Sequence, residues 1–474
     1  HVHLEIFKRA LNLGNKKINS ETKSFVGIDK RKQIKIDGKI KKLIERDKKV
    51  MLTTTRSSYP FVPDKGSGDL VIDISGNKFI DFSSFISVYN LGVNGNYEIR
   101  EAIKKQTDKL IHGAFTDYYG ELPVAFAEKL IEMFPKGFGK VFFSNSGTEA
   151  NEAALKFSKI FTKRQYTLSF YSAFHGRTMG SLGLTASKSS QRERFGPFNS
   201  NIHVPYAYCY RCPFGKEYPS CGMACVDYTK KNVLEKETSG KEISSIFIEP
   251  IQGEGGYVVP PKEFITEIRK LASDNGILLV ADEVQSGYMR TGKFLALDNF
   301  GVEADIYTMA KSIASGIPMG VTITRSSLGD IPSGSHANTF GGNLIATAAA
   351  TASINYLKKH SSEIKIQIKN SSELIMKRLN EMSELYSIIG DIRGIGLMIG
   401  IELVIDRKTK EPAVKEREAI LNRCFENGLI LLPAGQSVIR IIPPITISKK
   451  ALEEGLNILE EAIKLENKKL HKLA

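Results

Sequence analysis

The most constraining feature of the chain is an alternation of short apolar runs with amphipathic helical patterns between residues 140 and 325. Apolar runs at 141–143, 245–248 and 277–281 each adjoin a stretch in which apolar residues recur at helical spacing. This order is typical of a parallel β-sheet with helices on both faces. The flanks differ, because 70–82 alternates like antiparallel strand around a turn and 383–464 mixes strands with a final amphipathic helix. We therefore expect an α/β fold in which both flanks build one smaller lobe.

The length of 474 residues exceeds what one ordinary core accommodates, so we expect two packed domains. We predict a basic, partly disordered arm at 1–43 and the N-terminal part of a small domain at 44–105. A large domain should follow at 106–345, with a cysteine-rich insertion at about 206–226. The C-terminal part of the small domain should occupy 346–474.

The net charge of +14 is concentrated at one end of the chain. Residues 1–50 hold 15 Lys and Arg against 6 Asp and Glu, which leaves +9 in this segment. We interpret it mainly as a solvated arm, with nucleic-acid binding as the minor alternative. The chain has no run of about 18 apolar residues and no apolar signal segment. We expect no nucleic-acid or membrane partner, and a cytoplasmic location.

Polar residues stand at the ends of four predicted strands. They are the segment 144–148, Glu249, the pair Asp282 and Glu283, and Lys311. In open α/β sheets, ligands bind just beyond the carboxyl ends of the strands. Four strands that each end on a polar group are harder to explain by packing than any one of them. The pattern indicates a single shared site.

The chemistry of these groups narrows the kind of ligand. A predicted helix begins at Ser146, Gly147 and Thr148, and its free N–H groups and dipole favour an anion. The alternative is that Ser146 or Thr148 serves only as a helix cap. Lys311 lies in a small, apolar, glycine-containing stretch, where loss of water lowers an amine pKa and favours Schiff-base chemistry. Asp282 ends a predicted buried strand, so its carboxylate needs a partner there. A pyridinium nitrogen would be such a partner, and the alternatives are an arginine or a helix N-terminus. Together these are the parts of a pyridoxal phosphate site.

The motifs in this region resemble those of the class III, or ω-amino acid, aminotransferases of fold type I. The motifs are SNSGTEANEAA at 144–154, FHGRT at 174–178, EPIQGEGG at 249–256, ADEVQSG at 281–287, AK at 310–311 and TFGGN at 339–343. The resemblance runs from about residue 44 to the C-terminus, and archaeal 4-aminobutyrate and ornithine aminotransferases are similar. It implies a fold-type-I transferase with a mostly parallel seven-stranded sheet in the large domain.

The resemblance also implies a role for each cofactor residue. Lys311 would form the Schiff base and then carry the proton, a transfer worth about 10² to 10⁴ in rate. Asp282 would keep the ring nitrogen protonated, Gln285 would reach the ring hydroxyl, and Val284 and Phe174 would pack on opposite ring faces. The other implied cofactor residues are Ser146, Gly147, Thr148, His175, Glu249 and, from the neighbouring subunit, Thr339. A homodimer or a higher homo-oligomer is then the active unit.

The substrate residues are assigned in the same way. Arg177 would receive a distal carboxylate, and Arg440 the α-carboxylate of glutamate or 2-oxoglutarate, unless each is merely a surface ion pair. Glu254 would neutralise Arg440 when the donor lacks that carboxylate. Ile86 stands where the ornithine enzyme of the family has a tyrosine, which favours a 4-aminobutyrate-like donor. The segment 92–96 departs from the family's usual Gly-His-x-His-Pro pattern at the substrate entrance.

We therefore expect a ping-pong aminotransferase that moves an amino group from an ω-amino acid to 2-oxoglutarate. An ornithine, acetylornithine or broad-specificity aminotransferase is the nearest alternative, and an amino-acid racemase shares the same motifs. A cofactor-binding transcription regulator would need a helix-turn-helix, and residues 1–50 offer no convincing pair of helices.

Four cysteines in the insertion, Cys209, Cys212, Cys221 and Cys225, form a C-x2-C-x8-C-x3-C pattern. This spacing suits a thiolate metal site, two disulfides in a hyperthermophile, or reduced thiols. The sequence leaves these three possibilities open, and we assign no metal ligand. Cys424 lies in a predicted helix and is expected in the core.

Overall fold

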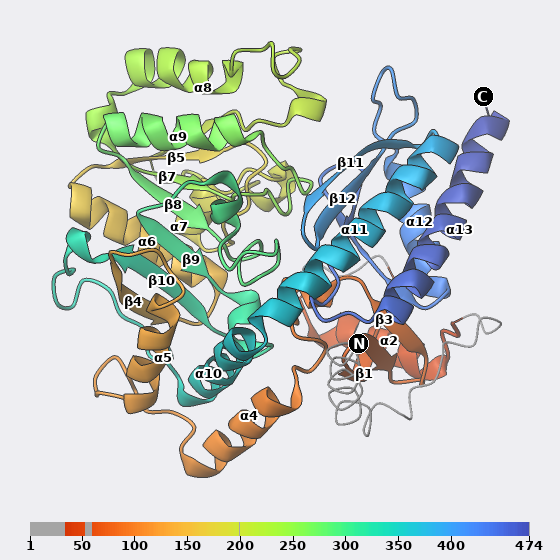
Figure 1. Ribbon diagram of the computed structural model, residues 1–474, viewed down its shortest axis with the longest axis horizontal. Helices are drawn as coiled ribbons and strands as arrows, with labels where there is room; N and C mark the ends of the chain where they lie inside the picture. The colour runs from red at the N-terminus through yellow and green to blue at the C-terminus, as the bar shows by residue number, and fades with distance from the viewer. Residues whose placement is uncertain (1–33, 53–58, 199, 474) are drawn as a thin grey trace, which may run out of the picture.

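A computed structural model describes residues 34–52, 59–198 and 200–473 of the chain. Two lobes lie side by side, one built on a seven-stranded sheet and the other on two four-stranded sheets (Figure 1). Most of the arm predicted at 1–43 falls outside the described residues, and its end enters helix α2 (Gly38–Val50). Within the described ranges, no helix is long and apolar enough to cross a membrane.

The large sheet has the strand order β4-β10-β9-β8-β7-β5-β6. Its strands are β4 (Phe138–Ser144), β5 (Tyr166–Phe170), β6 (Asn201–Val204), β7 (Ile243–Ile248), β8 (Leu278–Asp282), β9 (Ile306–Met309) and β10 (Gly320–Arg325). Only β10 runs antiparallel to its neighbours β4 and β9. The predicted α/β fold with a mostly parallel seven-stranded sheet is confirmed. Strands β7 and β9 are buried along their whole length, as strands covered on both faces should be.

The helix that follows β4 shows how the local sequence sets an element that the site needs. Helix α6 (Gly147–Thr162) begins at Ser146, whose hydroxyl accepts a hydrogen bond from the Glu149 N–H at 3.2 Å. It ends where Lys163 adopts a left-handed conformation. Its alanine-rich inner face is fully buried, so the helix packs closely on the sheet. The capping role of Ser146 is therefore real, whatever else the N-terminus binds.

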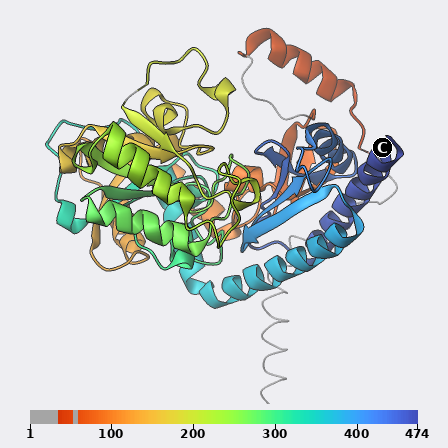
Figure 2. The same ribbon diagram turned by 90° about the horizontal axis from the view of Figure 1, so that it is seen from above.

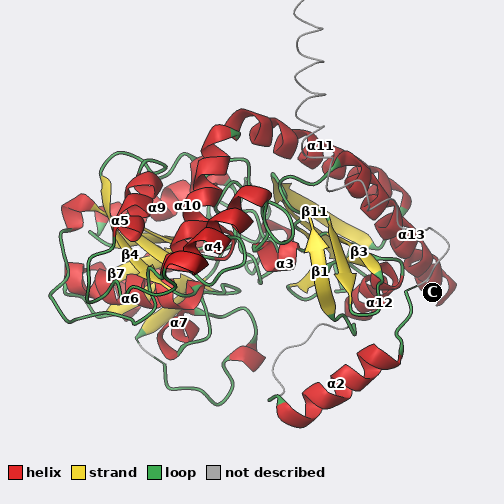
Figure 3. Ribbon diagram, turned by 90° about the horizontal axis from the view of Figure 1, so that it is seen from below, coloured by secondary structure: helices red, strands yellow, loops and turns green. Residues whose placement is uncertain are grey.

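The remaining helices of the large lobe surround the sheet. They are α4 (Tyr97–Lys109), α5 (Glu121–Ile131), α7 (Met179–Leu184), α8 (Ala224–Tyr228), α9 (Lys262–Asp274) and α10 (Leu344–Lys359). Helix α10 packs against α4 and α5, and the three lie together in Figures 1 and 3. The domain boundaries that we placed at 105 and 345 remain predictions.

The small lobe joins segments from both ends of the chain. One sheet contains β1 (Pro63–Ser67), β2 (Leu70–Asp73), β3 (Lys78–Asp81) and β13 (Leu429–Ile430), which pairs in parallel with β3. The other contains β11 (Ile389–Ile395), β12 (Met398–Leu403), β14 (Leu432–Ala434) and β15 (Val438–Ile441). The short helix α3 (Ser84–Ser87) follows β3, α12 (Val414–Glu426) precedes β13, and α11 (Ser361–Leu385) and α13 (Lys449–Leu473) run along one side of the lobe (Figure 2).

A buried arginine ties the two lobes together. The Arg290 side chain is fully buried, and its Nη1 donates hydrogen bonds to the carbonyl oxygens of Leu397, at 3.2 Å, and Pro443. Its Nη2 donates to Asn90 Oδ1 at 2.5 Å. Burial lowers the Arg290 pKa to about 10, which still leaves the guanidinium charged at neutral pH. Arg290 thus fixes the loop after β8 to the small lobe.

Candidate active site

A cavity of about 390 Å³ lies beyond the carboxyl ends of β4, β7, β8 and β9. The predicted site residues that line it are Ser146, Gly147, Thr148, Phe174, His175, Arg177, Glu249, Glu254, Asp282, Val284, Gln285 and Lys311. The four strand ends singled out in the sequence therefore do meet at one place. Arg440 reaches the cavity wall through Glu254, whereas Ile86 and Thr339 are not among the lining residues.

Lys311 stands directly after β9 and has a left-handed backbone conformation, with φ of 47°. This is an unusual conformation for a residue with a side chain, and it occurs more often at functional sites. Burial lowers the Lys311 pKa, although the carboxylates of Glu254 and Asp282 oppose the shift. In the described part of the chain, no hydrogen-bond acceptor for its ammonium is found. The amine is thus available to a ligand in the cavity.

Three partners hold Asp282 at the end of β8. Its Oδ2 accepts a hydrogen bond from Asn151 Nδ2 at 2.8 Å and lies 2.8 Å from His175 Nδ1, and its Oδ1 accepts from the Val284 N–H at 3.0 Å. Within the described ranges, it has no arginine partner, which argues against the arginine alternative. His175 Nε2 is buried without a partner in the described structure. The carboxylate is therefore oriented at the cavity wall, where it can pair with a cationic group of a ligand.

The N-terminus of α6 lies at the cavity, where we predict an anion to bind. In the described residues, no acceptor is found for the N–H groups of Gly147 and Thr148, which point with the helix dipole toward the cavity. Thr148 Oγ1 lies 2.8 Å from Thr178 Oγ1 and 2.5 Å from Ser181 Oγ. A Cβ on Gly147 would stand 2.7 Å from Val284 Cγ1, so glycine is required for this close approach.

Glu249 positions the loops around the cavity. Its carboxylate accepts hydrogen bonds from the Phe174 N–H at 2.8 Å and the Gly253 N–H at 2.9 Å. Burial raises the pKa of Glu249, while the neighbouring His175 opposes the shift. Through its bond to the Phe174 N–H, Glu249 holds the Phe174 backbone at the cavity wall.

The two arginines that we predicted to bind substrate carboxylates differ in their surroundings. Arg440 is buried, and its Nη1 donates to Glu254 Oε1 at 2.8 Å. Burial raises the pKa of Glu254, but Arg440 and Lys311 outweigh burial and the net shift is downward. Arg177 is exposed, and its guanidinium lies 5.5 Å from the centre of the Phe174 ring. Neither arginine is an ordinary surface ion pair.

Two residues that we placed in the site lie outside the cavity of their own chain. Ile86 is 43% exposed and has φ of 67° within α3. Thr339 is exposed on the loop before α10. Two residues near the site were not predicted from the sequence. Asn151 lies on the buried face of α6, and a polar residue among alanines was the signal that could have identified it. Tyr257 comes directly after the motif at 249–256.

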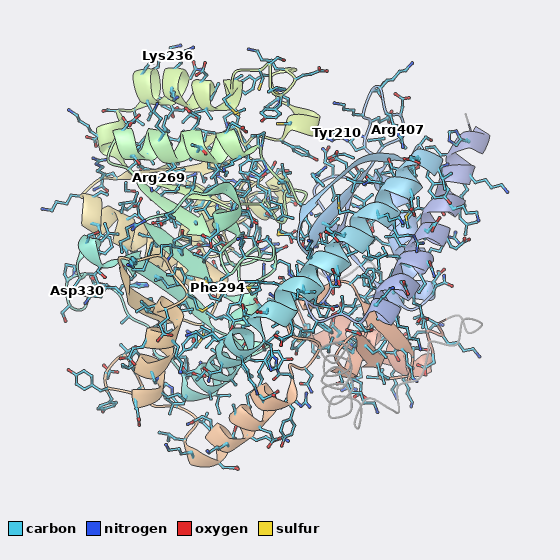
Figure 4. The ribbon with its side chains drawn as sticks, viewed as in Figure 1. Tyr210, Lys236, Arg269, Phe294, Asp330 and Arg407 are labelled. Carbon is cyan, nitrogen blue, oxygen red and sulfur yellow. The ribbon has the colours of Figure 1, made fainter. Side chains whose placement is uncertain are left out.

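The four cysteines of the insertion line one small cavity and are free thiols. Disulfides are therefore absent from the described insertion. No group of three or more His, Cys, Asp or Glu side chains in the described structure is arranged to hold a metal ion. The insertion instead contacts the small lobe, and Figure 4 shows Tyr210 on the side that faces that lobe. Lys410 Nζ of the small lobe lies 4.7 Å from the ring centre of Tyr210. Cys424 is buried in α12, as predicted.

Glu283, next to Asp282, faces away from the cavity and accepts hydrogen bonds from the N–H groups of Ala296 and Leu297, each at 2.9 Å. Burial raises its pKa from 4.5 to about 7. A raised carboxyl pKa means that protonation favours the folded state, so this stability is present below pH 4.5 and is lost as the pH rises to 7. We expect the melting temperature of the wild type to fall over this range, with a contribution of roughly 3 kcal/mol from Glu283.

Thermal denaturation at a series of pH values checks this expectation. Glu283→Gln should flatten the decline, while Glu373→Gln, at an exposed position of α11, should leave it unchanged. Equal slopes for the wild type and Glu283→Gln would contradict the assignment.

Comparison with known proteins agrees with the geometry. The model of the family "Aminotransferase class-III" matches residues 52–463. The chain belongs to the class III aminotransferases. A leucine/methionine racemase of Thermococcus litoralis is 40% identical over 423 residues, which cover 89% of this chain and 95% of the relative. A probable 4-aminobutyrate aminotransferase of Bacillus subtilis is 33% identical, covering 84% and 92%.

Solved structures of this class III aminotransferase fold are also similar. The taurine:2-oxoglutarate aminotransferase of Bifidobacterium kashiwanohense, in complex with PLP and glutamate, matches with a TM-score of 0.84 and 26% identity over 91% of this chain and 98% of that chain. This chain is a PLP-dependent enzyme of the transaminase class. The cavity fits the cofactor, because it brings together the Lys311 amine, the N-terminus of α6 and the Asp282 carboxylate.

Proposed function

We propose that this class III aminotransferase moves an amino group from an ω-amino acid such as 4-aminobutyrate to 2-oxoglutarate. The buried ion pair between Arg440 and Glu254 carries this proposal. A buried arginine suits the α-carboxylate of 2-oxoglutarate, because a bidentate pair is strong where water is excluded. Glu254 neutralises Arg440 when the donor lacks that carboxylate, so one pocket serves both half-reactions.

The residues that would hold the cofactor follow from the cavity. The N–H groups of Gly147 and Thr148 would bind the phosphate, Phe174 and Val284 would enclose the ring, and Asp282 would hold a proton on the ring nitrogen. When bound, the cofactor supplies an electron sink for the substrate carbon.

Lys311 has two tasks in this proposal. Its amine would hold the cofactor covalently, and once released by the substrate amine it would move a proton at the substrate carbon. Its lowered pKa favours the neutral, nucleophilic form. In our proposal, Thr339 of a neighbouring subunit completes the phosphate site, so the functional form is a homodimer. We also propose that the enzyme acts in the cytoplasm.

The test separates the two half-reactions. Purified enzyme loaded with pyridoxal phosphate is mixed with one donor at a time, and the bleaching of the visible band is recorded in a stopped-flow instrument. We expect 4-aminobutyrate to bleach the band faster than ornithine, lysine or alanine, and 2-oxoglutarate to restore it. Bleaching by ornithine alone would assign the enzyme to the ornithine group instead.

Arg440→Met provides a sharper check of the carboxylate assignment. We expect the KM for 2-oxoglutarate to rise by about 10- to 100-fold, since a charged hydrogen-bonding partner is lost, while the 4-aminobutyrate half-reaction changes much less. The matched control is Arg378→Met, which removes a partly buried arginine ion-paired with Glu460 in the small lobe. An unchanged KM in Arg440→Met would refute the role of Arg440.

Racemisation is the second candidate, and the similarity to the Thermococcus racemase favours it. A racemase takes the proton off the same substrate carbon, returns a proton to the opposite face of that carbon, and needs no second substrate. Incubation of the enzyme with a single enantiomer of an amino acid, without added keto acid, discriminates the two functions. Loss of optical rotation without formation of keto acid would identify a racemase, whereas stable rotation and bleaching of the cofactor band would support transamination.

A further inference from the structure

Tyr257 is a buried residue that lies behind the wall of the cavity. Its side chain is completely buried, and its backbone has φ of 52°. Its carbonyl oxygen accepts a hydrogen bond from Arg393 Nε at 3.1 Å, and a Cβ on Gly400 of β12 would stand 2.9 Å from the Tyr257 Cβ. The small-lobe sheet therefore fixes the direction of the ring.

The Tyr257 hydroxyl sits between two groups that our proposed function uses. It donates a hydrogen bond to Gln285 Oε1 at 2.7 Å. It also lies beside the Arg440 guanidinium. The Tyr257 hydroxyl raises the pKa of Arg440, whereas burial lowers it. The remaining polar contact of this guanidinium is Glu254, and Arg440 Nε has no hydrogen-bond partner in the described residues.

The chemistry of these groups fixes which way the protons point. An arginine has only donors, so any hydrogen bond between Arg440 and the Tyr257 oxygen is one that the oxygen accepts, and the single Tyr257 proton goes to Gln285 Oε1 at 2.7 Å. Burial raises the pKa of Tyr257 to about 12, so that proton is present at neutral pH. Because Oε1 of Gln285 accepts from Tyr257, the amide must turn its NH₂ group away from Tyr257. Gln285 lines the cavity, and this NH₂ finds no acceptor in the described part of the chain.

We propose that Tyr257 is a positioning residue that holds Arg440 and, through the same hydroxyl, sets the amide of Gln285 so that it donates into the cavity. The inference rests on the proposed function, in which Gln285 meets the ring oxygen of the cofactor and Arg440 meets the substrate carboxylate. The hydroxyl thereby links the substrate end of the cavity to the cofactor end.

This link explains what keeps Arg440 in place during turnover. When an α-carboxylate arrives, Arg440 exchanges Glu254 for the substrate. The Tyr257 oxygen remains a partner throughout, because the small-lobe sheet holds its ring. Without that oxygen the guanidinium has one acceptor fewer, and the Gln285 amide is free to rotate and present its oxygen to the anionic ring oxygen.

The variant that tests this is Tyr257→Phe, which removes one oxygen and keeps the ring. The first readout needs no turnover, since it is the pH dependence of the visible absorption of the bound cofactor without substrate. We expect the midpoint of this pH-dependent absorption change to move upward by about one pH unit, because the ring oxygen of the cofactor loses a hydrogen-bond donor. The second readout is the KM for 2-oxoglutarate, which should rise by about tenfold, while that for 4-aminobutyrate stays within a factor of roughly two.

The control is Tyr288→Phe, which removes an equally buried hydroxyl that bonds Ser353 at 2.9 Å. A double variant distinguishes positioning from general packing. If Tyr257 acts through Gln285, Tyr257→Phe should add no further midpoint shift in a Gln285→Leu background, whereas independent effects would add.

The outcomes are decisive in either direction. A midpoint shift in Tyr257→Phe that is absent in Tyr288→Phe supports the inference even if the wild type proves to be a racemase, because no amino transfer is measured. The same midpoint and the same KM values in both tyrosine variants would overturn it. Additive shifts in the double variant would overturn the role through Gln285.

Discussion

Lys311→Ala should lower kcat for amino transfer by about 10⁴-fold, at the upper end of what a positioned proton carrier contributes. The variant loses the amine that stands at the end of β9 with a lowered pKa. It should still bind pyridoxal phosphate through the α6 N-terminus, but without a covalent bond. Reduction with borohydride followed by mass spectrometry measures the covalent cofactor directly.

The control for this experiment is Lys159→Ala. Burial also lowers the Lys159 pKa, but this lysine lies on α6 away from the cavity lining. It should retain both activity and trapped cofactor. Trapping in Lys311→Ala as strong as in the wild type would show that another lysine binds the cofactor.

Asp282→Asn should lower kcat by roughly 10³-fold, because the neutral amide can no longer stabilise a proton on the ring nitrogen. The asparagine side chain has nearly the same shape as aspartate, so the loss of kcat measures the effect of the carboxylate charge. Steady-state kinetics, together with the absorption spectrum of the bound cofactor, reports both effects. Asp305→Asn is the matched control, since Asp305 is a partly buried aspartate that pairs with Arg269 outside the cavity.

An Asp282→Asn variant that keeps more than about a tenth of the wild-type kcat would contradict the assigned role. His175→Gln separates the contribution of the Asp282 carboxylate from that of its neighbour His175. We expect a smaller loss of kcat in His175→Gln, because His175 orients Asp282 from 2.8 Å in our assignment.

Much of the fold follows from local patterns in the sequence. Mostly apolar runs at 245–248 and 277–281 predict β7 and β8, because strands covered on both faces are rich in apolar residues. The antiparallel placement of β10 between β4 and β9 does not follow, since strand order depends on contacts between segments far apart in the chain. The parallel pairing of β13 with β3 is hidden for the same reason.

The candidate site was predictable where a residue has a local signature. Lys311, Asp282 and Gly147 each follow a strand, and strand ends meet at one edge of the sheet. Tyr257 was not predictable, because its importance comes from Gln285 and Arg440, which lie elsewhere in the chain. Ile86 was assigned by resemblance alone, and its exposed position depends on the fold of α3.

The sheet that joins β1, β2 and β3 with β13 has a consequence for biosynthesis. The ribosome makes the first three strands early, whereas the fourth emerges only after the whole large lobe has been translated. Until then the open side of β3 offers unpaired N–H and C=O groups to any passing strand. This sheet of the small lobe can therefore be completed only late in synthesis, when β13 arrives.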